Sequence, residues 1–197
     1  KTALNMSEFS LKAMRNGGMY DQVGFGFHRY STDGSWLVPH FEKMLYDQAI
    51  LVQAYLDAYQ ATGKQYYADV VDEILQYVLR DMTAKEGGFY SAEDADSEGE
   101  EGLYYIWNKK ELNSFLTEEE YAFISPILNI KENGNSIVER RKTNIPHFTS
   151  NWNELIALSA LGEEEFDEKY HLIRKKIFNY REKRVHPQKD DKILTDW

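Results

Sequence analysis

Residues 65–82 read QYYADVVDEILQYVLRDM, and this stretch decides the fold class. Its apolar side chains recur at the three- and four-residue spacing of one helix face: Tyr67, Val70, Val71, Ile74, Leu75, Val78 and Met82. The stretch before it, 39–63, predicts a long helix that opens at Pro39 as an early-turn residue and ends at Gly63. Because only a short link separates the two amphipathic segments, we expect an antiparallel helical hairpin.

Further helices are predicted on both sides of this hairpin. Each has an apolar stripe together with a start or stop signal, such as Gly17-Gly18 after the first helix or Thr117 as an N-cap. The predicted helices span 2–16, 152–161 and 162–187, and two more begin at about 109 and at 117. No fixed-period similarity links these helices, which argues against a plain repeat solenoid.

Two segments, 19–38 and 88–107, do not follow a helical period. Asp33-Gly34 between short aromatic or β-branched runs predicts a hairpin turn in the first, and the second has an acidic turn between two aromatic runs. Residues 131–149 predict a polar loop. The expected architecture is one all-α domain over residues 1–197, with both β-hairpin insertions on one side.

Composition excludes several classes of function. The chain carries 33 acidic and 23 basic side chains, a formal charge of -10, which disfavours nucleic acid and anionic membranes as partners. There is no cysteine, so disulfides and thiolate metal sites are excluded, and a cytoplasmic location is expected. No apolar run is long enough to cross a bilayer. Because the chain starts at Lys1 within a helical pattern and stops at Trp197 after a polar loop, it is expected to be part of a longer polypeptide.

The first candidate site lies around the start of the helix expected at Pro39. On that helix His40, Lys43 and Asp47 share one face at i, i+3 and i+7, beside the apolar stripe, so they should line a cavity. The residues in this constellation are His28, Arg29, Tyr30, Trp36, His40, Glu42, Lys43 and Asp47. Two nearby imidazoles could form an acid and base pair. The spacing fits equally well with packed, hydrogen-bonded histidines and a surface Lys43–Asp47 pair, and both interpretations stay open.

The second candidate site is the acidic stretch 91–102, with six carboxylates within nine residues and no basic residue. A calcium loop of EF-hand type is excluded, because its twelfth position, which needs a bidentate Glu, is Tyr105. No metal site is predicted. Glu93, Asp94 and Asp96 are candidate acids or bases because aromatic residues flank them, and the remaining carboxylates are expected to be solvated.

Aromatic residues concentrate in the same two segments. Tyr30, Trp36, Tyr105 and Trp107 lie there among charged, hydrogen-bonding groups. Flat apolar rings beside such groups suit the recognition of a pyranose, although they also suit protein interfaces. Phosphate-binding loops, dinucleotide fingerprints, zincin motifs and nucleophile elbows are absent from the sequence, so no cofactor is predicted.

Four blocks of sequence resemble the signature blocks of one family: 17–21, 26–31, 36–48 and 91–97, with a looser match at 190–197. These blocks are similar to those of the spermatogenesis-associated protein 20-like family, whose members combine a thioredoxin-like domain with a helical barrel. The resemblance implies a six-hairpin (α/α) toroid of the six-hairpin glycosidase or N-acylglucosamine 2-epimerase type. It further implies that this chain is the first half of the toroid, with the thioredoxin-like domain before Lys1 and the later hairpins after Trp197.

The function expected from these observations is that of a carbohydrate-active domain binding a sugar or similar small polar ligand at the mouth of the toroid. In an epimerase, His28 and His40 would exchange a proton while Arg29 and Lys43 steady charge. In a glycoside hydrolase, Asp47 would pair with Glu93, Asp94 or Asp96. Residues expected to bind the ligand are Arg29, Tyr30, Trp36, Lys43, Asp96, Tyr105 and Trp107. The alternatives are a non-catalytic scaffold that partners a thioredoxin-like domain and a helical interaction protein. Uncovered apolar faces should bind the rest of the polypeptide or cause self-association.

Overall fold

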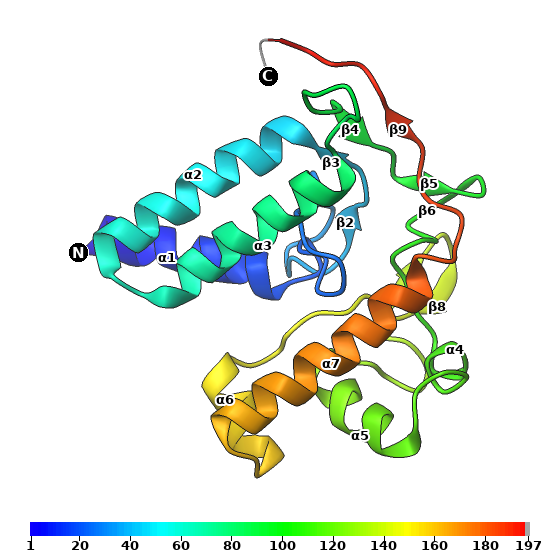
Figure 1. The fold of residues 1–197 in the computed structure, drawn as a ribbon. Helices are drawn as coiled ribbons and strands as arrows, with labels where there is room; N and C mark the ends of the chain where they lie inside the picture. Colours follow the sequence, from blue (N-terminus) through cyan, green and yellow to red (C-terminus); the bar gives the residue numbers. More distant parts are fainter. Residues whose placement is uncertain (196–197) are drawn as a thin grey trace.

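The computed structural model describes residues 1–195, and its helices form two groups (Figure 1). The first group holds α1 (Thr2–Asn16), α2 (Leu45–Thr62) and α3 (Gln65–Asp81). Helices α2 and α3 form the predicted antiparallel hairpin, and Gly63 ends α2 with a left-handed φ of 68°. Its core is aromatic and aliphatic, with Phe27, Tyr55, Tyr67 and Ile74 fully buried.

The second group holds α4 (Lys109–Leu112), α5 (Glu118–Ile127), α6 (Trp152–Ser159) and α7 (Glu163–Arg181). Thr117 caps α5 with a reciprocal capping box, as the sequence predicts, and Asn151 caps α6 in the same way. Trp107, Ile124, Phe166 and Ile173 form its core. Each group therefore has its own apolar centre, and about half of the described residues are helical, which confirms the helical part of the predicted fold.

Short strands follow one side of both groups. Strand β1 (Tyr30–Ser31) pairs with β2 (Pro39–His40), and β3 (Lys43–Met44), β4 (Ala92–Glu93) and β9 (Lys189–Asp190) form a three-stranded antiparallel sheet in that order. Two further hairpins are β5 (Asp96–Ser97) with β6 (Glu100–Glu101) and β7 (Ser136–Val138) with β8 (Arg141–Thr143). The last hairpin lies in the segment predicted to be a polar loop, so that prediction was incomplete. Residues 196 and 197, the end of the looser family match, lie outside the described residues.

The prediction that a helix opens at Pro39 was wrong. Helix α2 starts at Leu45, because Pro39 stands opposite Ser31 in one hairpin and Lys43 stands opposite Glu93 in the sheet. Extended pairing therefore replaces the first turn and a half that the apolar period suggested. As a result His40 and Lys43 lie in strands and only Asp47 is helical, so the three do not share a helix face.

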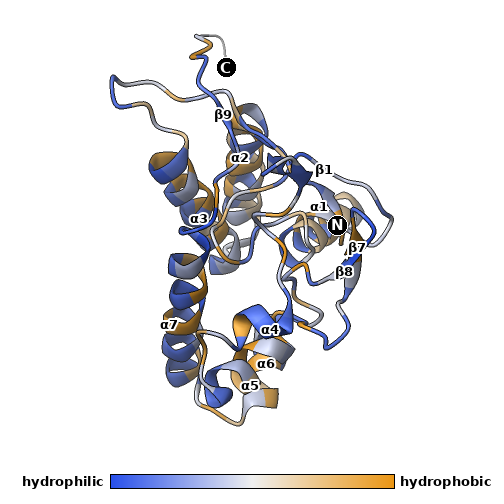
Figure 2. Ribbon diagram, turned by 90° about the vertical axis from the view of Figure 1, so that its right-hand side faces the viewer, coloured by the Kyte–Doolittle hydropathy of each residue, from blue (hydrophilic) through white to orange (hydrophobic). Residues whose placement is uncertain are grey.

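Apolar side chains remain exposed on several helices, whose ribbons carry orange segments in Figure 2. Phe9 of α1, Ile50 of α2 and Leu79 of α3 are 73%, 65% and 65% exposed, and Leu172 of α7 is 64% exposed. Such faces are typical of surfaces that another segment covers. Among the described residues no helix combines the length and apolarity needed to cross a membrane.

Candidate functional site

Strand pairing brings together the three segments singled out in the sequence. The glycine-rich stretch joins the segment after Pro39 through β1 and β2, and that segment joins the acidic stretch through Lys43 opposite Glu93. The three segments therefore lie together, but their residues separate into two layers. One layer is a buried cluster of charges, and the other is an exposed rim with a groove beside it.

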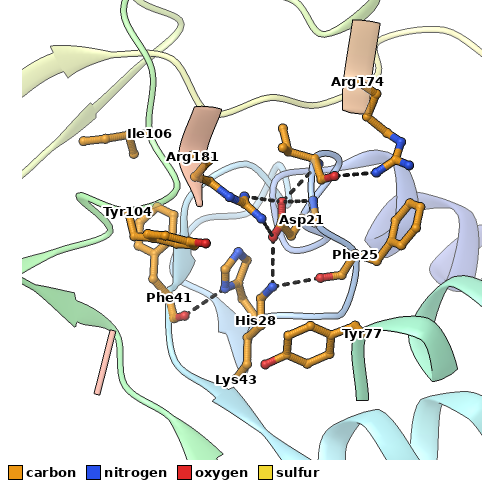
Figure 3. Close-up of polar contacts among 12 residues, drawn as sticks. Asp21, Phe25, His28, Phe41, Lys43, Tyr77, Tyr104, Ile106, Arg174 and Arg181 are labelled. Atoms are coloured by element: carbon orange, nitrogen blue, oxygen red, sulfur yellow. Dashed lines mark hydrogen bonds and ion pairs between the residues drawn. The ribbon is translucent and has the colours of Figure 1, made fainter. Parts of the chain in front are cut away.

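Asp21 is the centre of the buried layer (Figure 3). Its two carboxylate oxygens accept hydrogen bonds from the two terminal nitrogens of the Arg181 guanidinium, both at 2.8 Å, and Oδ2 also accepts from the Lys43 ammonium at 3.0 Å. The backbone N–H groups of Val23 and Gly24 donate to Oδ1 at 3.0 Å. Asp21, Lys43 and Arg181 are each at least 94% buried, so this is an ion network closed from solvent.

The electrostatics of the cluster follow from burial and pairing. Burial opposes every charge, yet Arg181 and Lys43 together hold the pKa of Asp21 well below its usual range. Burial lowers the pKa of Lys43, and Asp21 and Glu93 oppose that effect. The hollow beside these groups measures about 10 Å³, which is roughly the space of one water molecule. A sugar does not fit there, so the cluster supports the architecture.

His28, Glu93 and Tyr105 belong to this buried layer. His28 is 2% exposed, its Nδ1 lies 2.8 Å from the carbonyl oxygen of Phe41, and burial together with Lys43 lowers its pKa to about 3. Glu93 accepts a hydrogen bond from the hydroxyl of Tyr77 at 2.8 Å. Tyr105 packs edge-on against His28, with ring centroids 4.6 Å apart. The structure thus gives His28 a neutral, packed imidazole away from the surface where His40 lies.

His40 is the centre of the exposed rim. Its Nδ1 lies 2.7 Å from Glu101 Oε1, and because a carboxylate only accepts, Nδ1 carries the proton. Nε2 therefore has a free lone pair in the neutral ring, and it lies 3.6 Å from Glu42 Oε2. Glu42 is also paired with Arg29 at 2.8 Å, and the half-exposed ring of Tyr30 stacks on His40 at 5.1 Å. This is an imidazole oriented by one carboxylate with a second carboxylate beside its free nitrogen.

A groove of about 610 Å³ adjoins the rim along the β3–β4–β9 sheet. The lining comes from Glu42, from Ser91 and Asp94, and from residues 188–192 with Leu194. Most of these groups are polar, and Asp94 is exposed. The groove has the size of a small-ligand site and offers groups that can bind hydroxyls. Glu42 belongs to both features, since it lines the groove and lies next to His40.

Asp47 lies in the first turn of α2, near the rim. Burial raises its pKa to about 6, Glu42 adds to that rise and Arg29 opposes it. Its Oδ2 is buried without a hydrogen-bond partner among the described residues. A half-buried carboxyl with such a pKa can both give and take a proton near neutral pH, which is the property of a general acid or base.

Replacing Asp47 with Asn should stabilise the protein above pH 6. The folded pKa of Asp47 is raised, so its stabilising protonated form is fully present only below about pH 4 and is lost as the pH rises through 6. Asn keeps the neutral shape, and the gain at pH 7.5 should be about 1 kcal/mol, since solvent screens a half-exposed group. Urea denaturation at pH 4 and pH 7.5 measures the difference. An equal effect at both values would show that the carboxyl is not destabilised by burial.

The remaining predicted residues are Trp36, Asp96 and Trp107. Trp36 is half-buried with a left-handed φ of 62°, and its carbonyl accepts from the Gly18 N–H at 2.8 Å. Asp96 is exposed in β5, where it stands opposite Glu101, the carboxylate that contacts His40. Trp107 is fully buried under the guanidinium of Arg184, 3.9 Å from its ring centroid. Trp107 is therefore a core residue, whereas Trp36 is only partly buried.

Sequence reasoning missed Asp21, Arg181 and Glu101. Arg181 is 160 residues from its partner Asp21, and Glu101 is 61 residues from His40, so spacing could not reveal either pair. Asp21 had one signal in the sequence. It comes shortly before Gly24 and Gly26, where backbone N–H groups are free to point at a carboxylate. Glu101 had none that distinguished it from the other five carboxylates of its segment.

Several proteins are similar to this chain in sequence. No protein-family model matches it. Spermatogenesis-associated protein 20 of Homo sapiens is 39% identical over 99% of this chain and 28% of that protein, and its Mus musculus counterpart is 52% identical over 64% of the chain and 17% of that protein. An uncharacterized protein of Caenorhabditis elegans is 30% identical over the whole chain and 30% of its own length. The chain thus spans less than a third of the curated relatives that it matches most fully.

One solved structure shows a weak similarity. The crystal structure of a D-mannose isomerase matches with a TM-score of 0.40 and 17% sequence identity, over 90% of this chain and 51% of that chain. That level is too low to assign a shared fold or activity. The sequence relatives, in contrast, confirm the resemblance predicted from the four blocks. Because the human protein of that name matches it along nearly its whole length at 39% identity, the chain belongs to the spermatogenesis-associated protein 20 family.

Proposed function

We propose that this chain binds a small polyhydroxylated ligand, a sugar or a close analogue, in the groove beside His40, and that His40 takes a proton from it. The observation that carries the proposal is the position of Glu42, which lines the groove and lies 3.6 Å from the free nitrogen of His40. A ligand hydroxyl or acidic C–H that approaches His40 Nε2 from the groove would meet a base oriented by Glu101.

Several features support a sugar over other ligands. The groove offers carboxylates from Glu42, Asp94 and Asp190, all of which accept hydrogen bonds from hydroxyl groups. Tyr30 adds an exposed ring on which the C–H face of a pyranose can rest. An anionic ligand would be repelled by the same carboxylates, although Arg29 and Lys189 lie nearby.

The proposal keeps His40 as one proton-transfer group but does not use His28 as the other. His28 is buried with a low pKa, so the second proton-transfer group in the proposal is Asp47, whose pKa of about 6 suits exchange near neutral pH. The charges of Arg29 and Glu42 both affect the pKa of Asp47, which supports a role for Asp47 near the rim. Reactions that fit a base and an acid on one ligand are epimerisation or isomerisation, with glycoside hydrolysis as the other class.

A thermal-shift screen of the full chain against D-glucose, D-mannose and D-galactose tests the proposal. A ligand that binds the native state should raise the unfolding temperature along a saturating curve, corresponding to about 2.7 kcal/mol at one hundred times its Kd. Glu42→Gln is the matched variant, because it keeps the shape of the side chain and loses its charge. Sugars also stabilise proteins by exclusion from the surface, an effect that is linear in concentration and equal in both proteins. The proposal would be rejected if, with every hexose, the unfolding temperature rose linearly with concentration and equally in the parent protein and in Glu42→Gln.

The second candidate function is that of a non-catalytic scaffold. The exposed apolar side chains of Phe9, Ile50 and Leu79 favour it, because they offer faces that further hairpins of a toroid, another domain or a second copy could cover. A closed (α/α) toroid would be completed in this way. Failure of all three hexoses in the screen above would favour the scaffold.

A further inference from the structure

A second cleft lies between the two helix groups, away from the rim and its groove. It measures about 350 Å³, within the range of small-molecule sites. Four elements form it: the end of α1, one face of α3, the start of α6 and one face of α7. On α3 the lining residues are Tyr66, Asp69, Val70 and Glu73, which follow helical spacing and so share one face.

Aromatic rings make up one part of the lining. Trp152 is 5.6 Å from Phe148 and 4.8 Å from Tyr170 between ring centroids, and it meets Tyr170 at 85°. Its indole N–H donates a hydrogen bond to Asp167 Oδ1 at 2.8 Å, which fixes the orientation of the ring. Tyr66 adds a fourth ring from α3. The cleft is therefore lined by aromatic rings that contacts within the chain hold in place, and the Arg15 guanidinium lies over the Phe148 ring at 5.6 Å.

Carboxylates make up the other part, and they outnumber the cations. The lining holds three carboxylates, those of Asp69, Glu73 and Asp167, and one guanidinium, that of Arg15. Arg15 is fully engaged, because two of its nitrogens donate to Glu73 Oε2 at 3.2 and 2.8 Å and the third donates to Gln22 at 2.5 Å. The charges of Arg15 and Glu73 cancel, and the two carboxylates of Asp69 and Asp167 remain in excess.

His171 does not change this balance at neutral pH. It is the other lining residue that could carry a positive charge, and burial, followed by the nearby Arg174, lowers the pKa of its imidazole below the usual range. A neutral imidazole next to Tyr170, with ring centroids 5.4 Å apart, adds one more flat surface. The lining thus combines aromatic faces with a net negative charge.

We propose that this cleft binds a small organic ammonium ion. Ring faces attract a desolvated cation through their quadrupoles, and Asp69 and Asp167 would balance its charge. A neutral sugar would gain nothing from the excess charge, and an anion would be repelled by it. The inference is independent of the rim, since none of the residues that line this cleft lines the groove beside His40.

Calorimetric titration of the full chain with choline and with its neutral isostere 3,3-dimethylbutan-1-ol tests this inference. The two probes have the same shape and differ in charge. Choline should bind saturably, and the neutral isostere should bind at least about tenfold more weakly, as expected for a cation among rings and carboxylates. Equal affinities, or no saturable binding of choline, would overturn the proposal.

Two variants assign the binding to the cleft. Asp167→Asn removes a charge but keeps the oxygen that accepts from Trp152, so it should weaken choline binding several-fold without loss of folding. Asp72→Asn on the same helix as Asp69 is the control, because Asp72 is exposed and does not line the cleft. Unchanged choline binding in Asp167→Asn, or equal weakening in both variants, would overturn the assignment.

Discussion

Replacing Asp21 with Asn is expected to lower the free energy of unfolding by about 3–5 kcal/mol, because it leaves two cations without a carboxylate in the interior. Lys43 and Arg181 are 1% and 2% exposed at the side chain, and both donate to Asp21. Asn cannot balance their charge, and its amide N–H₂ would face one of them. Urea denaturation followed by circular dichroism at pH 7 measures the loss.

The matched control for Asp21 is a surface ion pair. Lys176 and Glu120 are linked at 2.7 Å but partly exposed, so Lys176→Ala should cost less than about 1 kcal/mol. Similar losses in both variants would mean that the buried network is no stronger than a surface pair. That result would remove Asp21 as the link between the glycine-rich stretch and α7.

The same network should make the protein sensitive to acid. The folded pKa of Asp21 lies well below its usual range, so its contribution is present above the ordinary carboxyl pKa and is lost as the pH falls through the folded value. The free energy of unfolding should therefore fall at acid pH more steeply in the parent protein than in Asp21→Asn.

Replacing His40 with Gln is expected to slow proton exchange at a bound hexose on the order of 10²-fold. This is the contribution of a positioned base that takes a proton from the ligand. His40 is a quarter exposed and its ring contacts Glu101, Glu42 and Tyr30, so folding should persist. Incubation in D₂O with a hexose that passes the thermal screen measures the reaction, because a base that removes a carbon-bound proton returns deuterium. NMR detects the exchanged position.

The matched control for His40 is His186→Gln. His186 is 40% exposed at the side chain and lies 3.8 Å from Glu182, so it is another surface imidazole beside a carboxylate. It does not line the groove. The exchange rate should stay at the parental value in this control, whereas equal rates in His40→Gln and the parent would exclude His40 as the base.

Local signals in the sequence were sufficient for the helices. The apolar period of 65–82, the stop at Gly63 and the capping box at Thr117 all act within a few residues, and each is found in the structure. The stretch 39–44 failed because its conformation is set by partners elsewhere in the chain. Pro39 pairs with Ser31, and Lys43 pairs with Glu93, 50 positions away.

The candidate site was predicted in its segments and not in its details. The sequence placed His40, Glu42 and the acidic stretch together, and strand pairing does so. It could not distinguish buried from exposed polar residues, since Lys43 and Glu93 look as solvated as Glu42 and Asp94 when only their types are known. Which of these polar residues are buried depends on Arg181, a residue near the other end of the chain that binds Asp21.

The central claim is that a polyhydroxylated ligand binds beside His40, and NMR of protein labelled with ¹⁵N at its five histidines tests it most directly. Addition of a hexose that raises the unfolding temperature should move the imidazole resonances of His40, while those of His28 and His171 stay in place, because one is buried and the other lies in the second cleft. A saturating hexose that leaves the His40 signals unmoved, or that shifts those of His171 instead, would contradict the claim.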